Sequence, residues 1–344
     1  MNKTKDNLKE VKRIPNRTVK ESDLHSYLLG GHRSSFELLN RFKCTPEALN
    51  IHINSLQNFK YLVQMDAEGK YFISKDLPIN FKHTFNKDMW QGDILKFGFT
   101  SDNHLCNKHE RLDVLNLLYN IFEDEEIHTV YNGGNWIDGE FRFNKNELLV
   151  HGLTSQIEYA VKHYPYKKDI TTYFIAGDDH EGWYVQREGI DIGEYFEMKR
   201  RQAGMNDLIY LGYAEADIEL TEKGFRNKSW LRLLHAGGGS AYALSYSAQK
   251  IVESYQGGEK PSVLLIGHFH KLDYSFPREV HCIQMGCTED QSLFMRKKRI
   301  QAMVGGGIIT LRRAADGTIN RCSIEFITAY DKKFYIGKNK YFQR

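Results

Sequence analysis

The sequence contains no apolar run long enough to cross a membrane, and its beginning, Met-Asn-Lys-Thr-Lys, is polar and charged, without the pattern of a signal peptide. Its 5 cysteines form no Cys-x-x-Cys pair, and their odd number argues against a disulfide framework. There is no internal repeat and no low-complexity tract. The net charge of +3 is too small to indicate a class of partner. These absences favour a cytoplasmic globular protein with reduced thiols and no membrane contact.

Charge is concentrated at the two ends of the chain. Residues 1–20 hold seven Lys/Arg against two acids, and residues 331–344 hold five against one. We predict a disordered basic tail over residues 1–20, because this segment is polar and has few large apolar side chains, and a second basic tail over residues 331–344. Solvated, mobile chain and an anion-binding role are equal alternatives for both tails. The 344 residues suffice for one catalytic domain and one small domain.

Residues 21–78 show the pattern of three short helices and a hairpin. Ser34 has the N-cap chemistry for the second helix, and Thr45-Pro46-Glu47 caps the third. Two short strands, Tyr61–Met65 and Tyr71–Ile73, flank a glycine turn. This order resembles a winged helix, and we therefore predict a winged-helix-like domain over residues 21–78.

In winged helices, the second helix of the helix-turn-helix pair enters the major groove of DNA. The exposed side of that helix would present uncharged donors and acceptors, namely Asn50, His52, Asn54, Gln57 and Asn58. Attraction of phosphates would then come from Lys60, Lys70, Lys75 or the basic tail. We predict a nucleic-acid partner, DNA in the first place. Winged helices also bind proteins, so a protein-binding or homodimerisation domain stays open as the alternative.

We assign residues 79–94 to a linker and residues 95–330 to the second domain. There, predicted strands first alternate with helices and later follow one another directly. The alternating strands are Lys96–Thr100, Ile127–Tyr131, Thr171–Ala176, Trp230–Leu234 and Val263–Ile266. The later strands are Val280–Met285, Ala302–Leu311 and Thr318–Ile327. This pattern predicts an α/β fold in which two sheets pack face to face, with helices outside.

Five of the predicted strands end in polar clusters, which are Asp102/His104, Asn135/Asp138, Asp178/Asp179/His180, His235 and His268/His270. Turn chemistry explains any one of them, because Asn, Asp and Gly dominate turns. Five in the same topological position, all with side chains that ligate divalent metals, favour a metal site at the carboxyl ends of the strands. Imidazole with carboxylate suits Mn, Fe, Zn or Ni. Two such ions about 3.5–4 Å apart clamp a phosphoryl group and activate a water.

In order and spacing, these clusters resemble the motifs of the calcineurin-like metallophosphoesterases over residues 95–290. The family's motifs are Asp-x-His, Gly-Asp-x-x-Asp, Gly-Asn-His-Asp/Glu, a lone His and Gly-His-x-His, each after a strand. The resemblance implies a two-sheet sandwich flanked by helices. It also implies two divalent metal ions, manganese in the first place and iron, zinc or nickel as alternatives.

The resemblance also assigns roles to residues of this sequence. Asp102, His104 and His270 would hold the first ion. His235 and His268 would hold the second, with Asn135 and Asp179 as further ligands. His180 would lie beside the scissile phosphate, where it stabilises charge or protonates the leaving oxygen. Asp138 is the second catalytic candidate.

Two positions depart from the family pattern. The family's bridging aspartate falls on Asn135, which can ligate through its carbonyl oxygen but carries no negative charge. The third motif, Gly177-Asp178-Asp179-His180-Glu181, is one residue longer than the family's and places Asp179 at the position of an asparagine. We therefore hypothesise that Asp179 returns the charge that is lost at Asn135, and that Asp178 is the extra residue.

Other residues are candidates for binding substrate. His151 lies between the second and third motifs, and Arg296 and Lys297 belong to a basic run after the last one. A surface or capping histidine and a solvated basic face are the alternatives. Trp136 and Trp183 lie inside motifs and could stack on a base, although packing in the core is favoured.

The combined prediction is a metal-dependent phosphodiesterase, in the first place a DNA nuclease, that uses a metal-bound hydroxide for attack on phosphorus. Two alternatives within enzymes are a phosphomonoesterase and a cyclic-nucleotide phosphodiesterase. A third alternative is a DNA- or protein-binding module whose catalysis is impaired by Asn135.

Overall fold

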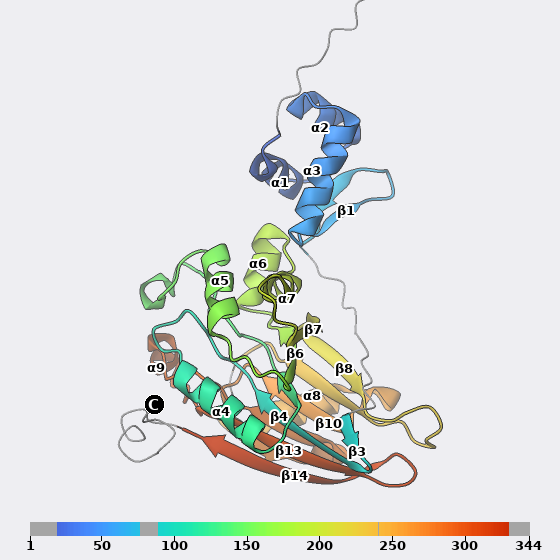
Figure 1. Cartoon of the computed structure of the whole chain (residues 1–344), viewed down its shortest axis with the longest axis vertical. Helices are drawn as coiled ribbons and strands as arrows, with labels where there is room; N and C mark the ends of the chain where they lie inside the picture. Colours follow the sequence, from blue (N-terminus) through green and yellow to red (C-terminus); the bar gives the residue numbers. More distant parts are fainter. Residues whose placement is uncertain (1–18, 76–88, 240, 330–344) are drawn as a thin grey trace, which may run out of the picture. The chain divides into compact units, whose positions relative to one another are not determined.

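The computed structural model describes residues 19–75, 89–239 and 241–329, which belong to two compact units (Figure 1). The smaller unit comprises Met1–Leu77 and Val185–Asp191, and the larger comprises Pro78–Tyr184 and Ile192–Arg344. Most of both predicted tails, and residues 79–88 of the predicted linker, lie outside the described residues. The tails and the linker therefore stay predictions.

The smaller unit has three helices and a two-stranded hairpin, which are α1 (Glu21–Leu29), α2 (Ser35–Phe42), α3 (Pro46–Asn58), β1 (Val63–Met65) and β2 (Tyr71–Ile73). Local sequence explains where the helices begin. The Ser34 hydroxyl accepts a hydrogen bond from the Glu37 backbone N–H at 3.3 Å, and Thr45 caps α3 with Pro46 at its first position. Apolar side chains from all three helices form the core of the unit, including Leu24, Leu28, Leu38, Leu49, Ile53 and Leu56. The assignment to the winged-helix class stays a prediction.

Two details of the smaller unit differ from the sequence prediction. His52 is half-buried on α3 rather than exposed, and Ile51 is exposed beside it. The segment Val185–Asp191 belongs to this unit, although the sequence placed it in the second domain. It is held there by main-chain hydrogen bonds, such as that from the Leu62 N–H to the Gly189 carbonyl at 2.7 Å. Such contacts leave no signal in the sequence.

The larger unit contains two sheets. One has the strand order β14-β13-β4-β5-β6-β7, with β3 also paired to β4. Its strands are β3 (Trp90–Gln91), β4 (Ile94–Thr100), β5 (Thr129–Asn132), β6 (Thr171–Ala176), β7 (Leu208–Tyr213), β13 (Gly305–Arg313) and β14 (Ile319–Thr328). The other has the order β11-β12-β10-β9-β8. Its strands are β8 (Glu215–Glu219), β9 (Trp230–His235), β10 (Val263–Gly267), β11 (Leu272–Ser275) and β12 (His281–Met285).

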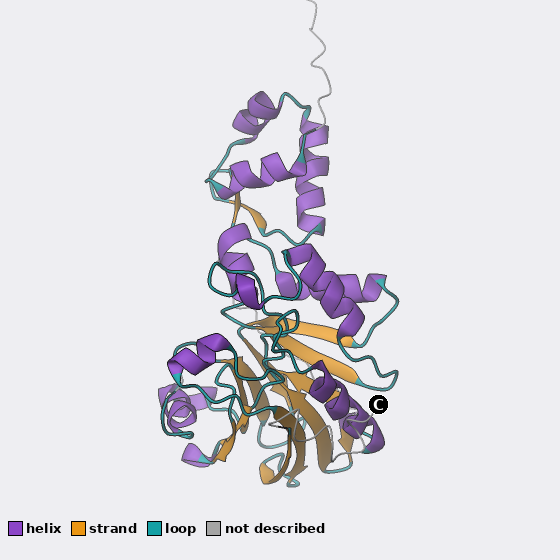
Figure 2. Ribbon diagram, turned by 90° about the vertical axis from the view of Figure 1, so that its left-hand side faces the viewer, coloured by secondary structure: helices purple, strands orange, loops and turns teal. Residues whose placement is uncertain are grey.

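The main core of the larger unit lies between the two sheets. Alternate residues of each strand enter it, for example Phe97 and Phe99 of β4 and Val263 and Leu265 of β10. The other residues of β10 pack with helix α8 (Tyr246–Ser254) on the outer face of the smaller sheet. Figure 2 shows the strands in the interior of this unit with helices around them. The predicted α/β fold with two facing sheets is therefore confirmed.

The remaining helices are α4 (Leu112–Asp124), α5 (Leu153–His163), α6 (Glu181–Glu188), α7 (Ile192–Gln202) and α9 (Leu293–Lys298). The sequence did not predict α6, α9, β3 or β11. Each of these elements is short, and the apolar periodicity that signals a helix or strand needs more residues to be recognised. No helix in the described ranges is long and apolar enough to cross a membrane.

Parallel pairing decides where the predicted motifs meet. Strands β4, β5 and β6 are neighbours and run in parallel, and so do β9 and β10 in the other sheet. Their carboxyl ends therefore lie at the same edge, and the residues that follow them enter one cleft. Gly267 allows the two sheets to approach there, because a Cβ at this position would lie 2.4 Å from the Gly133 carbonyl oxygen.

Candidate metal centre

The five polar clusters converge on one cleft with a volume of about 570 Å³. Its lining includes candidate ligands from four of the five strand ends, namely His104, Asn135, Asp178, Asp179, His268 and His270, together with His180 and Asp138. Asp102 and His235 lie buried directly behind this surface. The convergence that the sequence predicted is therefore present.

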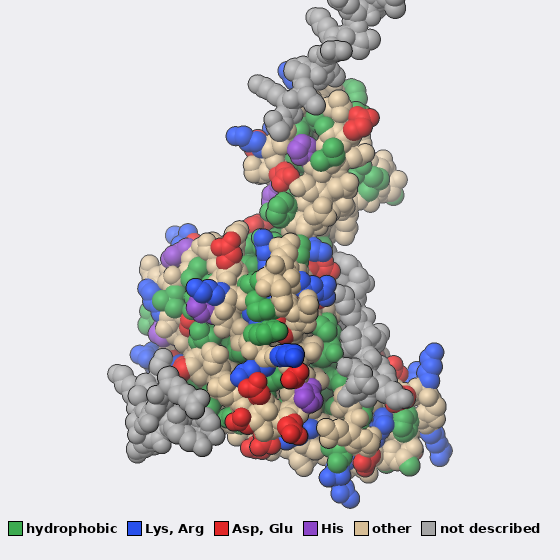
Figure 3. Space-filling view, in the orientation of Figure 1, with side chains coloured by type: hydrophobic (Ala, Val, Ile, Leu, Met, Phe, Trp, Pro, Cys, Tyr) green, Lys and Arg blue, Asp and Glu red, His purple; other side chains and the backbone are tan. Residues whose placement is uncertain are grey.

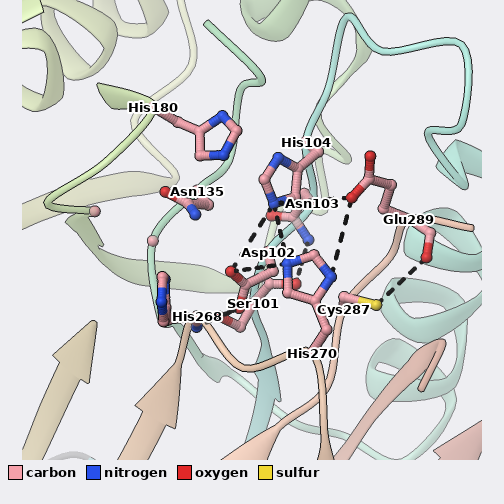
Figure 4. Close-up of polar contacts among 12 residues, drawn as sticks. Ser101, Asp102, Asn103, His104, Asn135, His180, His268, His270, Cys287 and Glu289 are labelled. Atoms are coloured by element: carbon pink, nitrogen blue, oxygen red, sulfur yellow. Dashed lines mark hydrogen bonds and ion pairs between the residues drawn. The ribbon is translucent and has the colours of Figure 1, made fainter. Parts of the chain in front are cut away.

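The first cluster consists of Asp102, His104 and His270, whose ligand atoms lie within 4.8 Å of one another. The Nε2 atoms of His104 and His270 face each other at 3.2 Å, and Oδ1 of Asp102 lies 3.6 Å from His270 Nε2. That oxygen is buried and has no hydrogen-bond partner. Figure 4 shows both imidazoles beside the Asp102 carboxylate. Two imidazole nitrogens around an unsatisfied carboxylate oxygen fit a divalent cation.

The Asp102 carboxylate is oriented by its other oxygen. Its Oδ2 accepts hydrogen bonds from the Ser101 hydroxyl at 2.6 Å and from the His268 backbone N–H at 2.8 Å. Burial by itself would raise the pKa of Asp102, but the imidazoles that face it, above all His270 and His235, lower the pKa below its usual value. These imidazoles therefore favour the ionised carboxylate, which is the form in which an aspartate binds a metal ion.

The second cluster consists of Asp178, Asp179, His235 and His268. Asp179 lies between the two imidazoles, with Oδ1 at 3.3 Å from His235 Nε2 and Oδ2 at 3.5 Å from His268 Nδ1. The opposite ring nitrogens donate to main-chain carbonyls, His235 Nδ1 to Gly133 at 2.7 Å and His268 Nε2 to Gly238 at 2.6 Å. These bonds fix the tautomers that direct a lone pair at the site, which is how protein histidines bind metals.

Protons and metal ions compete for this second cluster. Burial by itself lowers the pKa of His235, but the carboxylates of Asp179 and Asp102 outweigh it and raise the pKa to about 10. Burial likewise opposes ionisation of Asp179, yet His235, His180 and His268 lower the pKa of Asp179 below its usual range. A metal ion that binds here therefore displaces a proton from His235.

Asn135 occupies the position of the family's bridging aspartate. It is buried, and its side-chain Oδ1 has no hydrogen-bond partner although it faces the cleft. Its backbone N–H donates to Oε2 of Glu181 at 3.0 Å. Gly177 is required beside it, since a Cβ there would lie 2.2 Å from Asn135 Oδ1. The amide oxygen is thus free to bind a cation, but it is neutral.

Two further acidic residues lie at the ligand clusters. Asp178, which the sequence analysis treated as an extra residue, belongs to the second cluster together with Asp179. Glu289 was not predicted at all, yet its Oε2 lies 3.9 Å from His104 Nε2 and 4.0 Å from His270 Nδ1 (Figure 4). Burial, and the nearby carboxylates of Asp138 and Asp102, raise the pKa of Glu289 well above its usual value. Its only signal in the sequence is that it follows β12 as the motifs follow their strands.

Asp138 lies behind the ligands and orients them. Its Oδ1 is 3.1 Å from His104 Nδ1, and its Oδ2 accepts hydrogen bonds from Asn107 and Asn144, both at 2.9 Å. The backbone carbonyl of Asp138 accepts a bond from His180 Nδ1 at 2.6 Å. These contacts make Asp138 a positioning residue for two histidines, and its direct role in catalysis stays a prediction.

His180 lies at the surface of the cleft with one ring nitrogen anchored by Asp138. Burial by itself lowers the pKa of His180, but the carboxylates of Asp179 and Asp138 outweigh it and raise the pKa above its usual value. A histidine that keeps its proton near neutral pH can donate it to a leaving oxygen. His180 thus lines the cleft, and its role beside a scissile phosphate stays a prediction.

Backbone strain marks the site. Positive φ angles occur at six of its non-glycine residues, which are Asp102, His104, Asn135, His180, His268 and His270. Each such residue costs about 1–3 kcal/mol and persists only where its surroundings dictate the conformation, typically at functional sites. In this backbone conformation, the side chains that follow the strand ends point toward the cleft. The strain is therefore an independent sign that these six residues serve a function.

Glu181 is a further residue that the sequence analysis did not single out. Its buried carboxylate accepts three main-chain N–H bonds, from Asn135 and Gly177 at 3.0 Å and from Ile137 at 3.1 Å. It thereby ties the loop after β5 to the loop after β6. Burial raises the pKa of Glu181 to about 7.

We expect Glu181→Ala to destabilise the protein, because it leaves three buried N–H groups without an acceptor, each at a cost of about 1–3 kcal/mol. For a domain of this size that corresponds to a decrease in Tm of ~6 °C or more. Differential scanning calorimetry measures the change. The exposed Glu158→Ala on α5 is the matched control, and an equal, small shift in both variants would contradict the role assigned to Glu181.

The predicted substrate-binding residues are not in the cleft. His151 is 57% exposed at its side chain and lies 3.6 Å from Glu140 Oε2. Arg296 and Lys297 lie on exposed positions of α9, and only Lys298 of the basic run lines the cleft. Binding of substrate by His151, Arg296 and Lys297 stays a prediction, and on α9 neighbours in sequence point in different directions. Trp136 packs in the core against Phe196, as favoured, whereas Trp183 lines the cleft.

The larger unit has two facing sheets flanked by helices, with polar motifs after the strand ends, as the sequence predicted. Among solved structures, the chain is similar to an archaeal phosphodiesterase, with 14% identity over 68% of this chain and 100% of that one and a TM-score of 0.36. It is similar to Vps29 from Entamoeba histolytica complexed with zinc, with 12% identity over 68% and 99% of the chains and a TM-score of 0.32. It is also similar to a putative 5'-nucleotidase from Staphylococcus aureus, with 9% identity over 69% and 55% and a TM-score of 0.41.

No protein-family profile matches the sequence, and no curated protein matches it. The chain's own side chains form adjacent clusters of imidazole and carboxylate groups that could hold metal ions.

Proposed function

We propose that the protein is a metal-dependent phosphoesterase that hydrolyses phosphodiesters, and that its substrate is nucleic acid, DNA in the first place. One observation carries the proposal. Two clusters of imidazole and carboxylate ligands, centred on Asp102 and Asp179, lie at one edge of the facing sheets beside His180. Carboxylate and imidazole ligands suit Mn, Fe, Zn or Ni, and manganese is our first expectation.

Divalent cations held by these ligands would supply a water of lowered pKa and positive charge for the phosphoryl oxygens. The chain's own groups perform the remaining tasks. His180, protonated under the influence of Asp179 and Asp138, donates a proton to the leaving oxygen. Asp138 holds the rings of His104 and His180 in place, and Lys298 at the rim attracts the anionic substrate.

The choice of a nucleic-acid substrate is supported by the smaller unit and by the basic segments. Helix α3 presents Asn50, Asn54, Gln57 and Asn58 at its exposed surface, which are side chains suited to contact base edges or phosphates. Figure 3 shows basic and acidic side chains interspersed on the face in view. Binding of DNA would therefore depend on local basic groups, such as Lys298, rather than on a general positive surface.

The activity can be tested with two chromogenic esters in the presence of manganese. We expect hydrolysis of bis-p-nitrophenyl phosphate, a diester, at a kcat/KM at least about tenfold above that of p-nitrophenyl phosphate, a monoester. A preference for the monoester would favour a phosphomonoesterase. Absence of turnover of both esters with Mn, Ni, Co and Zn would show that the proposed enzymatic activity is wrong. The alternative function, a binding module without catalysis, would then be favoured. Cleavage of a labelled single-stranded oligodeoxynucleotide and of its duplex tests the nuclease activity directly.

A further inference from the structure

One side of the cleft is a wall of aromatic side chains. Phe143 comes from the loop that follows the second motif, Trp183 from α6 and Phe294 from α9, and all three line the cleft. The ring of Phe143 contacts the other two, with its centroid 5.5 Å from that of Trp183 and 6.1 Å from that of Phe294. Three separate segments of the chain thus build one aromatic surface, which we call the aromatic wall.

The aromatic wall is continuous with the candidate metal centre. The ring of Trp183 lies 4.5 Å from that of His180, with an angle of 32° between the planes. The ring of His180 in turn lies 4.5 Å from that of His104, a ligand of the first cluster. A substrate whose phosphate is bound at the metal ligands would therefore extend along these rings.

The aromatic wall is not part of the protein core. Phe143 is 60% exposed and Phe294 is 49% exposed, whereas Trp136, from the same motif region, is 1% exposed and stacks on Phe196. Exposed aromatic surface beside a polar site is unfavourable in water and is stabilised when a flat apolar group covers it. The wall thus has the properties of a binding surface.

We propose that the aromatic wall binds a nucleobase of the substrate by stacking, while the adjacent phosphate lies at the metal ligands. The proposal rests on the proposed function and specifies its substrate as a nucleotide unit. Three features favour a base over an acyl chain: the wall consists of flat rings, Lys298 places a positive charge in the same cleft, and the volume of about 570 Å³ fits a nucleotide. Stacking uses the π-face that every base has, so the site would accept all four bases.

Equilibrium binding to the full chain tests the proposal without reliance on turnover. Isothermal titration in manganese compares dAMP with 2-deoxyribose 5-phosphate, which has the same phosphate but no base, and chromatography verifies that both stay intact. We expect dAMP to bind roughly tenfold more tightly, the effect typical of one base stacked on an aromatic side chain. Hexyl phosphate serves as the probe for an acyl-chain site.

Variants locate the effect. We expect Phe143→Ala to remove most of the preference for dAMP while leaving the affinity for 2-deoxyribose 5-phosphate unchanged, and Phe143→Trp to retain the preference. Phe276→Ala, at a similarly exposed ring outside the cleft, is the matched control and is expected to keep the wild-type preference. Because Phe143 is exposed, circular dichroism and Tm are expected to show an intact fold.

Several outcomes would overturn the inference. Equal affinity for dAMP and 2-deoxyribose 5-phosphate would do so, as would an equal loss of both in Phe143→Ala or tighter binding of hexyl phosphate than of dAMP. Failure of the proposed function is distinguishable from these results. The protein could prefer dAMP in a way that depends on Phe143 and still hydrolyse neither chromogenic ester. That result would support the base-binding site and contradict the proposed enzymatic activity.

Discussion

Replacing Asp102 by asparagine is expected to abolish most of the activity and to remove the metal ion from the first cluster. Asparagine keeps the size of the side chain but removes the charge of the oxygen that faces His104 and His270. It also replaces a carboxylate oxygen that accepts the bonds from Ser101 and the His268 backbone. Loss of a group that stabilises charge in the reaction typically reduces kcat by about 10²–10³-fold. We expect kcat/KM for bis-p-nitrophenyl phosphate to fall by at least that factor.

Metal content provides the readout that does not depend on activity. Elemental analysis after gel filtration in manganese is expected to give fewer bound ions per chain for Asp102→Asn than for the wild type. The exposed Asp124→Asn, at the end of α4, makes the same chemical change away from the cleft and is the control. If Asp102→Asn kept the wild-type metal content and activity, Asp102 would not be a ligand.

Asp179→Asn is expected to weaken binding of the second metal ion, because Asp179 returns the charge that is missing at Asn135. Asp179 lies between His235 and His268, and its loss leaves only Asp178 as the anion of that cluster. Even groups that only support a ligand change metal affinity by about 10–100-fold, so we expect a loss of at least this size. Titration calorimetry with manganese measures it as a loss of the weaker binding step.

A second substitution tests whether the two positions compensate each other. In the double variant Asn135→Asp/Asp179→Asn, the carboxylate returns to the bridging position, and we expect the second ion to bind again with near wild-type affinity. The wild type, the two single variants and the double variant form a double-mutant cycle. Their metal affinities give the coupling free energy between positions 135 and 179 directly. If Asp179→Asn left the metal stoichiometry and activity unchanged, or if the effects of the two substitutions were simply additive, the compensation hypothesis would be wrong.

Most strands, with the exception of β3 and β11, could be predicted from the sequence because their signals are local. The same holds for the helices of eight or more residues, with the exception of α6. Apolar side chains of β4 and β10 alternate between two packed faces, and glycine or asparagine marks the strand ends where the chain turns. The ligands directly after those ends, such as His104 and His270, were predicted for the same reason. A side chain one to four residues beyond a buried parallel strand must lie at the carboxyl edge of the sheet.

Other features were decided by contacts between distant segments. Glu289 reaches the first cluster because β12 pairs with β10, and no spacing in the sequence expresses that pairing. Asp138 supports the ring of His104 at the cleft, and Asn107 and Asn144 hold its carboxylate in place. Of the basic run, the turn of α9 directs Lys298 to the cleft, whereas Arg296 and Lys297, predicted to bind substrate, do not line it.

By itself, the sequence determined the α/β class, the order of most strands along the chain and the candidate ligands that directly follow strand ends, because each depends on residues within a few positions of one another. Only the tertiary structure decided which further acidic residues join the ligand clusters and which aromatic rings form the wall. Those arrangements join segments more than a hundred residues apart, such as Phe143 and Phe294. Packing of whole elements, rather than local preference, sets the distances between them.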